Sequence, residues 1–272
     1  MLLTWTDDDC PTLQPTRRLR RLPGRPGLSP GNPRRVSPDP GSARRARVCI
    51  RGADPRRRGE GAAFVLDKVG PEQLYAFDQA CRVTAIREAV SAGIVATGAQ
   101  LSINFMPNAV YSPMACIQLT LRTAKEVGFS TDRLIFEFTE NERLQTAHVQ
   151  AIVAAYRQLG FKTAVDDFGA GYAGLGLLAA LQTDMVKLDM ELIRGIDADG
   201  RKRAVMEALV LLMRRLGTEI VAEGVETAEE LAVLRLFGVR YVQGFLFGQP
   251  RLGELTPYPA WLHEPTRTAA IS

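Results

Sequence analysis

The sequence predicts an α/β fold, a TIM-like (β/α) barrel that is incomplete at its N-terminus. Short apolar runs alternate with longer amphipathic stretches, and this alternation repeats along the chain from about residue 62. The chain has 272 residues, which is enough for one large domain of this kind. Strands separated by helical crossovers pair in parallel, so we expect a curled parallel sheet with helices on its outside.

The folded part is expected to begin near residue 62, where the composition changes. Pro71 suits the start of a helix. The stretch after it repeats apolar residues at helical spacing, at Leu74, Phe77, Cys81, Ala85 and Ile86. This pattern predicts an amphipathic helix ahead of the first clear strand.

Six strands are expected after this helix. They are 101–105, 134–138, 163–168, 185–189, 219–224 and 241–245. The segments between them have helical patterns, several of which end at a glycine suited to a helix C-cap. An eight-stranded barrel would therefore lack two strands at its N-terminus.

The first 61 residues differ in character from the rest of the chain. Residues 11–60 contain nine prolines and 14 arginines without helical or strand periodicity, so we expect disorder over 1–61. An alternative is that this segment is translated out of frame, since arginine-proline-glycine text is typical of GC-rich DNA read in the wrong frame. Residues 62–252 are then the barrel domain and 253–272 a C-terminal tail.

Composition excludes several classes of function. The arginine-rich segment has few interleaved aromatic residues and no amphipathic helix, so no nucleic-acid partner is predicted. The four cysteines show no C-x-x-C pairing and the two histidines are isolated, which argues against a zinc site or a disulfide framework. The sequence also has no apolar run near the roughly 18 residues that a membrane span needs. We therefore expect a cytoplasmic protein whose metal ions, if any, are bound by oxygen.

Polar side chains stand near the C-terminal ends of the predicted strands. They are Asn104, Glu137, Asp166, Asp167, Lys187, Glu223 and Gln243. In a parallel α/β barrel these strand ends share one rim, where such enzymes build their active sites. Taken singly, Asn104 is more typical of a strand-end turn, whereas a lysine inside an apolar strand needs a charged partner or a role.

Four converging carboxylates would repel each other unless cations bind, and oxygen ligands suit Mg²⁺ or Mn²⁺. This predicts metal-assisted phosphoester hydrolysis.

Five segments carry a resemblance to a known family. FEFTEN, VDDFGAGYAGL, VKLDM, VAEGVE and VQGFLFGQP resemble, in order, the signature motifs of the EAL-domain family. The resemblance covers about residues 62–250. It implies a barrel that binds two divalent cations, forms a homodimer and hydrolyses the bacterial second messenger cyclic di-GMP to linear pGpG.

The resemblance also implies roles for individual residues. Five resemble metal ligands, with Asp166 bridging the two ions: Asn104, Glu137, Asp166, Asp167 and Glu223. Lys187 resembles the lysine that orients the attacking water, and Gln243 a glutamine near that water. Glu140 and Glu226 resemble glutamates that support the metal ligands without binding the ions themselves. Each alone would be an ordinary solvated acid. The loop that couples metal binding to the dimer corresponds to Phe168, Gly169, Gly171 and Tyr172.

One family motif has no counterpart where it is expected. The Glu-Ala-Leu triplet that names the family does not occur before residue 62, and its glutamate is a metal ligand. In CIRGAD, Arg51 resembles the substrate-binding arginine after that triplet, but no glutamate precedes it. Two functions therefore stay open: a phosphodiesterase with poor or no turnover, and a non-catalytic EAL module that binds cyclic di-GMP or a protein partner.

Overall fold

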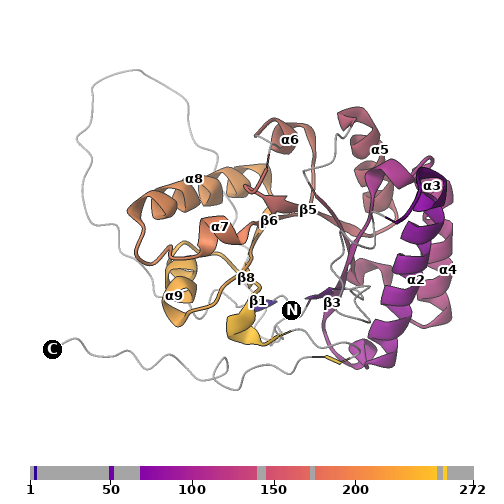
Figure 1. The fold of residues 1–272 in the computed structure, drawn as a ribbon, viewed down its shortest axis with the longest axis horizontal. Coiled ribbons are helices and arrows are strands. Elements are labelled where there is room, and N and C mark those ends of the chain that lie inside the picture. The colour runs from indigo at the N-terminus through magenta and orange to yellow at the C-terminus, as the bar shows by residue number, and fades with distance from the viewer. Residues whose placement is uncertain are drawn as a thin grey trace, which may run out of the picture.

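The computed structural model describes residues 3–4, 49–51, 68–139, 145–171, 175–249 and 254–255. Eight strands form one sheet in the order β1, β8, β7, β6, β5, β4, β3, β2. Neighbours from β2 to β8 run parallel, and β1 pairs antiparallel with β8. Within the described residues no ladder joins β1 to β2, so the sheet curls without closing (Figure 1).

Six of these strands match the six predicted from the sequence, with ends that differ by a few residues. They are β3 (Gln100–Asn104), β4 (Leu134–Thr139), β5 (Lys162–Phe168), β6 (Met185–Leu188), β7 (Glu219–Ala222) and β8 (Tyr241–Val242). β7 is shorter than predicted because Gly224 turns the chain with a positive φ of 71°. β8 is shorter because Phe245–Phe247 form the 3-10 helix η6.

Two short strands lie before residue 62, where the sequence predicted no regular structure. They are β1 (Leu3–Thr4) and β2 (Cys49–Arg51). Each pairs with an outer strand of the six-stranded sheet, at the edges where the missing barrel strands were expected. Unpaired backbone groups at a sheet edge can recruit an extended segment whatever its side chains. The side-chain pattern therefore did not predict these two strands.

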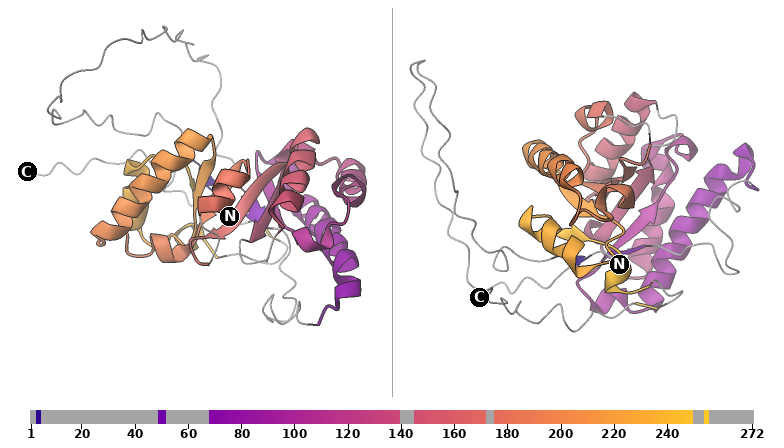
Figure 2. Two further views of the ribbon diagram at one scale, coloured as in Figure 1. Left: turned by 90° about the horizontal axis from the view of Figure 1, so that it is seen from above. Right: turned by 60° about the vertical axis from the view of Figure 1, so that its left-hand side comes forward.

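Helices cover the outside of the curled sheet. Those in the described residues are α2 (Leu74–Ser91), α3 (Pro113–Cys116), α4 (Gln118–Glu126), α5 (Thr146–Gln158), α6 (Leu175–Ala180), α7 (Met190–Ile193), α8 (Gly200–Leu216) and α9 (Ala228–Leu236). Figure 2 shows α8 and α9 outside one end of the curled sheet and the helices of the first half outside the other end. Glycines with positive φ follow four of them, as the sequence predicted: Gly128, Gly160, Gly217 and Gly238. No described helix is long and apolar enough to cross a membrane.

The buried face of α2 matches the predicted one only in part: Ala85 and Ile86 are buried as predicted. Its fully buried positions include Asp78 and Arg82, whereas Leu74, Phe77 and Cys81 are only partly buried. The two charged residues form an ion pair of 2.7 Å one helical turn apart. Burial raises the pKa of the Asp78 carboxyl above its ordinary value of 3.8, and the Arg82 charge opposes this rise.

This ion pair connects α2 to the loop that follows β3. The Arg82 guanidinium donates a hydrogen bond of 2.9 Å to the Tyr156 hydroxyl and stacks over the rings of Phe105 and Phe136. Asp78 accepts a hydrogen bond of 3.1 Å from the Met106 backbone N–H. The buried charges therefore fix the chain two residues beyond Asn104, one of the predicted site residues.

Candidate metal centre

The candidate site lies on the inner face of the curled sheet, one layer above an apolar layer. Four inner residues form a small buried cluster: Ile135, Ala164, Met185 and Val221. Two positions further along the chain in each case stand Glu137, Asp166 and Lys187, on their strands, and Glu223, directly after β7. Because side chains on one face of a strand recur every second residue, both sets point inward. Regular strand geometry thus brings the predicted charged residues together at one level.

Lys187 lies at the centre of this charged layer. Its Nζ atom is 2.7 Å from an Asp166 oxygen, 2.7 Å from a Glu223 oxygen and 3.1 Å from a Glu137 oxygen. The lysine, Asp166 and Glu137 are at most 3% exposed, and Glu223 is 8% exposed. The second Glu137 oxygen accepts a hydrogen bond from the Ser102 hydroxyl on β3. The sequence analysis did not identify Ser102, although it lies two residues before Asn104 on the same face.

A β-bulge brings two consecutive acids into the site. The β5–β6 register runs from Val165 opposite Val186 to Phe168 opposite Leu188, so Asp166 and Asp167 together oppose Lys187. Asp167 has a φ of 55°, in the left-handed region that non-glycine residues rarely adopt. Its backbone N–H donates a 3.1 Å hydrogen bond to the Asp166 carboxylate. In a regular strand neighbouring side chains point to opposite faces, so the bulge is what allows both acids to serve one site.

The acids fit a divalent cation. Asp166, Asp167 and Glu223 each offer a carboxylate oxygen, and these three oxygens lie within 4.8 Å of one another. Oxygen-only ligation by carboxylates suits hard divalent ions such as Mg²⁺, Mn²⁺ and Ca²⁺. If ionised, the four carboxylates carry four negative charges and Lys187 carries one positive charge. A cation is therefore the natural partner for the charge that remains.

Two predicted residues lie at neighbouring strand ends. Asn104 is the exposed last residue of β3 and is in register with Glu137. Gln243 directly follows β8 and is partly buried. Its backbone N–H donates to the Ala222 carbonyl at 2.8 Å, and its carbonyl accepts from the Val225 N–H at 3.0 Å. Both residues are therefore at the same rim of the sheet as the carboxylates.

The structure corrects two of the predicted placements. Glu226 is exposed and its Oε1 atom lies 2.5 Å from Nη2 of Arg194, the residue after α7, so it faces a surface cation instead of the carboxylate layer. Phe168 ends β5, as the predicted strand 163–168 has it, and is buried in the core, so its assignment to the loop is the part that is corrected. The loop begins at Gly169, whose φ is 102° and where a Cβ atom would lie 2.6 Å from a Leu192 methyl. Gly171 is exposed, as expected of that loop.

Three other predicted residues lie wholly or partly outside the residues that the structure describes. Glu140 and Tyr172 are outside the described residues, as are the side-chain contacts of Arg51. The Arg51 backbone ends β2 and is in register with Ser102. The sequence does contain a Glu-Ala-Leu triplet at residues 207–209, but Glu207 is exposed on α8, outside the sheet. That triplet therefore lies apart from the carboxylate layer.

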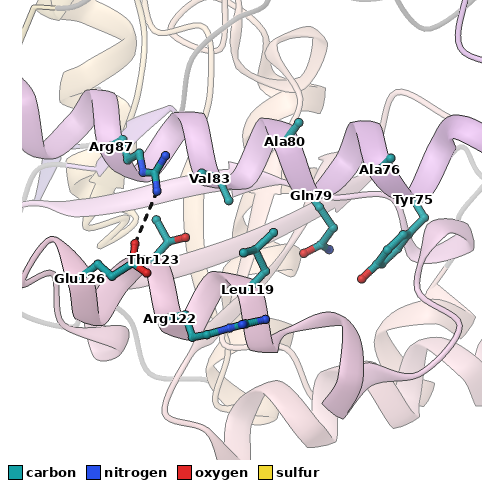
Figure 3. A pocket seen from close by; sticks show the side chains of 10 residues that line it. All are labelled: Tyr75, Ala76, Gln79, Ala80, Val83, Arg87, Leu119, Arg122, Thr123 and Glu126. Carbon is teal, nitrogen blue, oxygen red and sulfur yellow. Dashed lines mark hydrogen bonds and ion pairs between the residues drawn. The ribbon is translucent and has the colours of Figure 1, made fainter.

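A groove of about 540 Å³ lies away from this site, between α2 and α4. Figure 3 shows its lining, which runs from Tyr75 to an ion pair of 3.5 Å between Arg87 and Glu126. None of the predicted site residues lines it. The chemistry suggested by the sequence therefore belongs to the strand ends and not to this groove.

Comparison with solved structures supports the fold. The chain is similar to a standalone versatile EAL protein from Vibrio cholerae O395, solved in a c-di-GMP bound form, with a TM-score of 0.71 and 44% identity over 75% of this chain and 86% of that chain. It is also similar to BlrP1 from Klebsiella pneumoniae in a manganese and cyclic di-GMP complex, with a TM-score of 0.65 and 35% identity over 72% of this chain and 50% of that chain. EAL structures thus bind divalent metal ions together with cyclic di-GMP.

Sequence comparison identifies the family. The probable cyclic di-GMP phosphodiesterase PdeD from Escherichia coli strain K12 is 36% identical over 130 residues, which are 48% of this chain and 24% of that protein. The chain spans 40% or less of the length of the curated relatives it matches. The family model of the EAL domain matches residues 73–250, most of the chain and all of the motifs above. The chain belongs to the EAL domain family.

Proposed function

We propose that this chain hydrolyses cyclic di-GMP to linear pGpG at the carboxylate layer, with two divalent cations, Mg²⁺ or Mn²⁺, as cofactors. The observation that carries the proposal is the convergence of Glu137, Asp166 and Glu223 on Lys187, with Asp167 added by the bulge. A phosphodiester is an anion, so a site this rich in carboxylates needs cations before it can accept one. The proposed metal ligands are Asn104, Glu137, Asp166, Asp167 and Glu223.

In this proposal the protein residues hold and orient the attacking water. When bound, divalent cations polarise phosphoryl oxygens and lower the pKa of water. Lys187, a buried donor among the carboxylates, is placed to hold the attacking water, and Gln243 to orient it from the next strand end. The water oxygen forms a bond to phosphorus and the bond from phosphorus to one O3′ breaks. The proton that the water loses balances the proton that the leaving O3′ takes up. The product is a linear dinucleotide with a 5′-phosphate.

We further propose that residues 62–252 form the EAL domain, flanked by 1–61 and 253–272. The family match over 73–250 supports these bounds. A cytoplasmic homodimer is proposed because the substrate is a bacterial second messenger and because the family's loop after Asp167 takes part in a dimer contact. Light scattering of the purified chain tests the dimer.

A second function is a non-catalytic module that binds cyclic di-GMP or a protein partner. The observation that favours it is the absence of a Glu-Ala-Leu triplet before residue 62, because the triplet at 207–209 lies on α8. Loss of one charged ligand from a metal site usually costs far more than one hydrogen bond, since the residues of such a site act as a unit. Turnover is therefore expected to be slow if the chain is a phosphodiesterase and absent if it is a binding module.

One experiment separates the two functions. The full chain is incubated with cyclic di-GMP and Mn²⁺ or Mg²⁺, pGpG is measured by chromatography, and nucleotide binding is measured in parallel by calorimetry. Metal-dependent pGpG formation that Asp166→Asn abolishes supports the phosphodiesterase. Glu207→Ala is the matched control, because it removes the acid of the misplaced triplet and should leave turnover unchanged. Binding without pGpG supports a cyclic di-GMP receptor. Failure to bind the nucleotide overturns both the phosphodiesterase and the receptor, and only a module that binds a protein partner is then consistent with the result.

A further inference from the structure

We infer that Glu230 is a positioning residue, which fixes the direction of the Glu223 carboxylate by joining two loops at the rim of the site. This inference rests on the proposed metal site. Glu230 lies in the first turn of α9, seven residues beyond Glu223, and is 4% exposed. The sequence analysis did not single it out, because a glutamate in the first turn of a helix is common.

One Glu230 oxygen completes the start of its own helix. The Oε2 atom accepts hydrogen bonds from the backbone N–H groups of Glu226 at 2.9 Å and Thr227 at 3.2 Å. The Thr227 hydroxyl accepts from the Glu230 N–H at 3.2 Å, which completes a capping box. This half of the arrangement fixes the loop from Glu223 to Thr227 against α9.

The other Glu230 oxygen accepts a hydrogen bond from outside its own helix, which a helix cap does not require. The Oε1 atom accepts a 2.8 Å hydrogen bond from the N–H of Gly195, which is 35 residues away in the loop after α7. That loop follows β6, the strand that carries Lys187. A single buried carboxylate therefore ties the segment after the lysine to the segment after Glu223.

Two further contacts join the same segments. Met190 at the start of α7 packs so closely on Gly224 that a Cβ atom there would lie 2.4 Å from the Met190 Cβ. The ion pair between Arg194 and Glu226 adds an exposed contact. Of the three links, the Glu230 carboxylate is the buried one that accepts backbone hydrogen bonds from both loops.

Independently of Glu230, the Glu223 N–H donates to the Leu188 carbonyl at 3.1 Å and the Val225 N–H to the Gln243 carbonyl at 3.0 Å. Removal of the Glu230 carboxylate should therefore loosen the loop beyond these bonds, at Glu226 and Thr227, and through that loop change the direction of the Glu223 carboxylate.

The test compares three variants by two measurements. Hydrogen exchange followed by mass spectrometry reports on the backbone of residues 190–199 and 219–227, and calorimetry with Mn²⁺ alone reports on the metal site. Glu230→Ala should speed exchange in both segments and weaken Mn²⁺ binding by about 10-fold, the lower end of the loss for a partner bonded directly to a metal ligand, because Glu230 acts through the backbone. Glu230→Gln keeps one carbonyl acceptor and should restore part of the affinity.

Thr227→Ala is the matched control. It removes a hydrogen bond of the capping box from the same helix but leaves the Glu230 link to Gly195 in place. Its Mn²⁺ affinity should stay close to that of the unmodified chain. Equal losses in Glu230→Ala and Thr227→Ala would mean that Glu230 is a helix cap only, and unchanged exchange at 190–199 would overturn the inference. If the unmodified chain binds no Mn²⁺, the proposed function fails, but the exchange measurement still decides the role of Glu230. If Glu230→Ala does not fold, Glu230→Gln decides between the two outcomes.

Discussion

Replacement of Lys187 by methionine tests how the charged layer is held together. The lysine is 1% exposed and its ammonium lies 2.7–3.1 Å from three carboxylates, so Lys187→Met leaves buried acids without their cationic neighbour. Removal of one partner of a buried ion pair costs about 3–5 kcal/mol. For a domain of this size each kcal/mol lowers the melting temperature by about 2–4 °C. Without metal, the variant should therefore melt roughly 6–20 °C below the unmodified chain.

Divalent cations should reverse part of this loss. A ligand at one hundred times its Kd stabilises a folded protein by about 2.7 kcal/mol. In the unmodified chain the ammonium competes with the cation for the same oxygens, whereas in Lys187→Met it does not. Mn²⁺ should therefore raise the melting temperature of the variant by more than that of the unmodified chain.

The assay is thermal denaturation of both proteins with and without Mn²⁺. Lys125→Met, on the exposed surface of α4, is the control and should stay within about 0.5 kcal/mol of the unmodified chain. Equal stability of Lys187→Met and the unmodified chain without metal would show that the ion pairs do not hold the acids. An equal response to Mn²⁺ would show that the lysine and the cation do not share ligands.

Three further predictions concern the support of the site. Arg82→Met leaves Asp78 buried without its ion-pair partner and should lower the free energy of unfolding, measured in urea, by about 3–5 kcal/mol; an additional Asp78→Leu change should recover much of it. Because burial raises the pKa of Asp78, its proton is held more tightly in the folded state, so stability from this group is present below pH 3.8 and is lost as pH rises through the folded-state pKa. The stability difference between the unmodified chain and Asp78→Asn should therefore fall as pH rises from 3.8, and a rise would contradict the assignment. Gly224→Ala should cost more stability than Gly217→Ala, since both have φ near 70° but only the former meets a neighbour, Met190.

The sequence was sufficient to predict the six central strands and the level at which their polar residues meet. The two-residue period of a strand separates Met185 from Lys187 and Ile135 from Glu137. Both pairs point inward, as expected. Parallel strands end at one rim, so the convergence of Glu137 with Lys187 across 50 residues followed from topology alone. These predictions needed only local periodicity and the direction of the strands.

Features that depend on distant partners could not be predicted in the same way. Asp78 and Arg82 occupy the buried face of α2 because Tyr156 and the Met106 backbone supply hydrogen bonds from other elements. Hydrophobic periodicity assigns charged residues to the surface, so it selected Leu74 for that face instead. The bulge at Asp167 likewise requires the register of β5 against β6, which single-strand alternation does not contain.

In the proposed metal site, the contacts around Lys187 hold the acids in place although the glutamate implied by the family resemblance is not found before residue 62. Ser102 orients Glu137, the bulge orients Asp166 and Asp167, and the lysine neutralises part of their charge, all through protein contacts. A metal site that existed only in the presence of its ions would lose its geometry when one ligand is removed. Here the protein itself holds the acids in place, so loss of one ligand is expected to reduce metal affinity and turnover before it affects the fold. A chain of this fold can therefore lose turnover and still keep the folded site that binds a ligand. For this reason a binding module is an alternative to the enzyme.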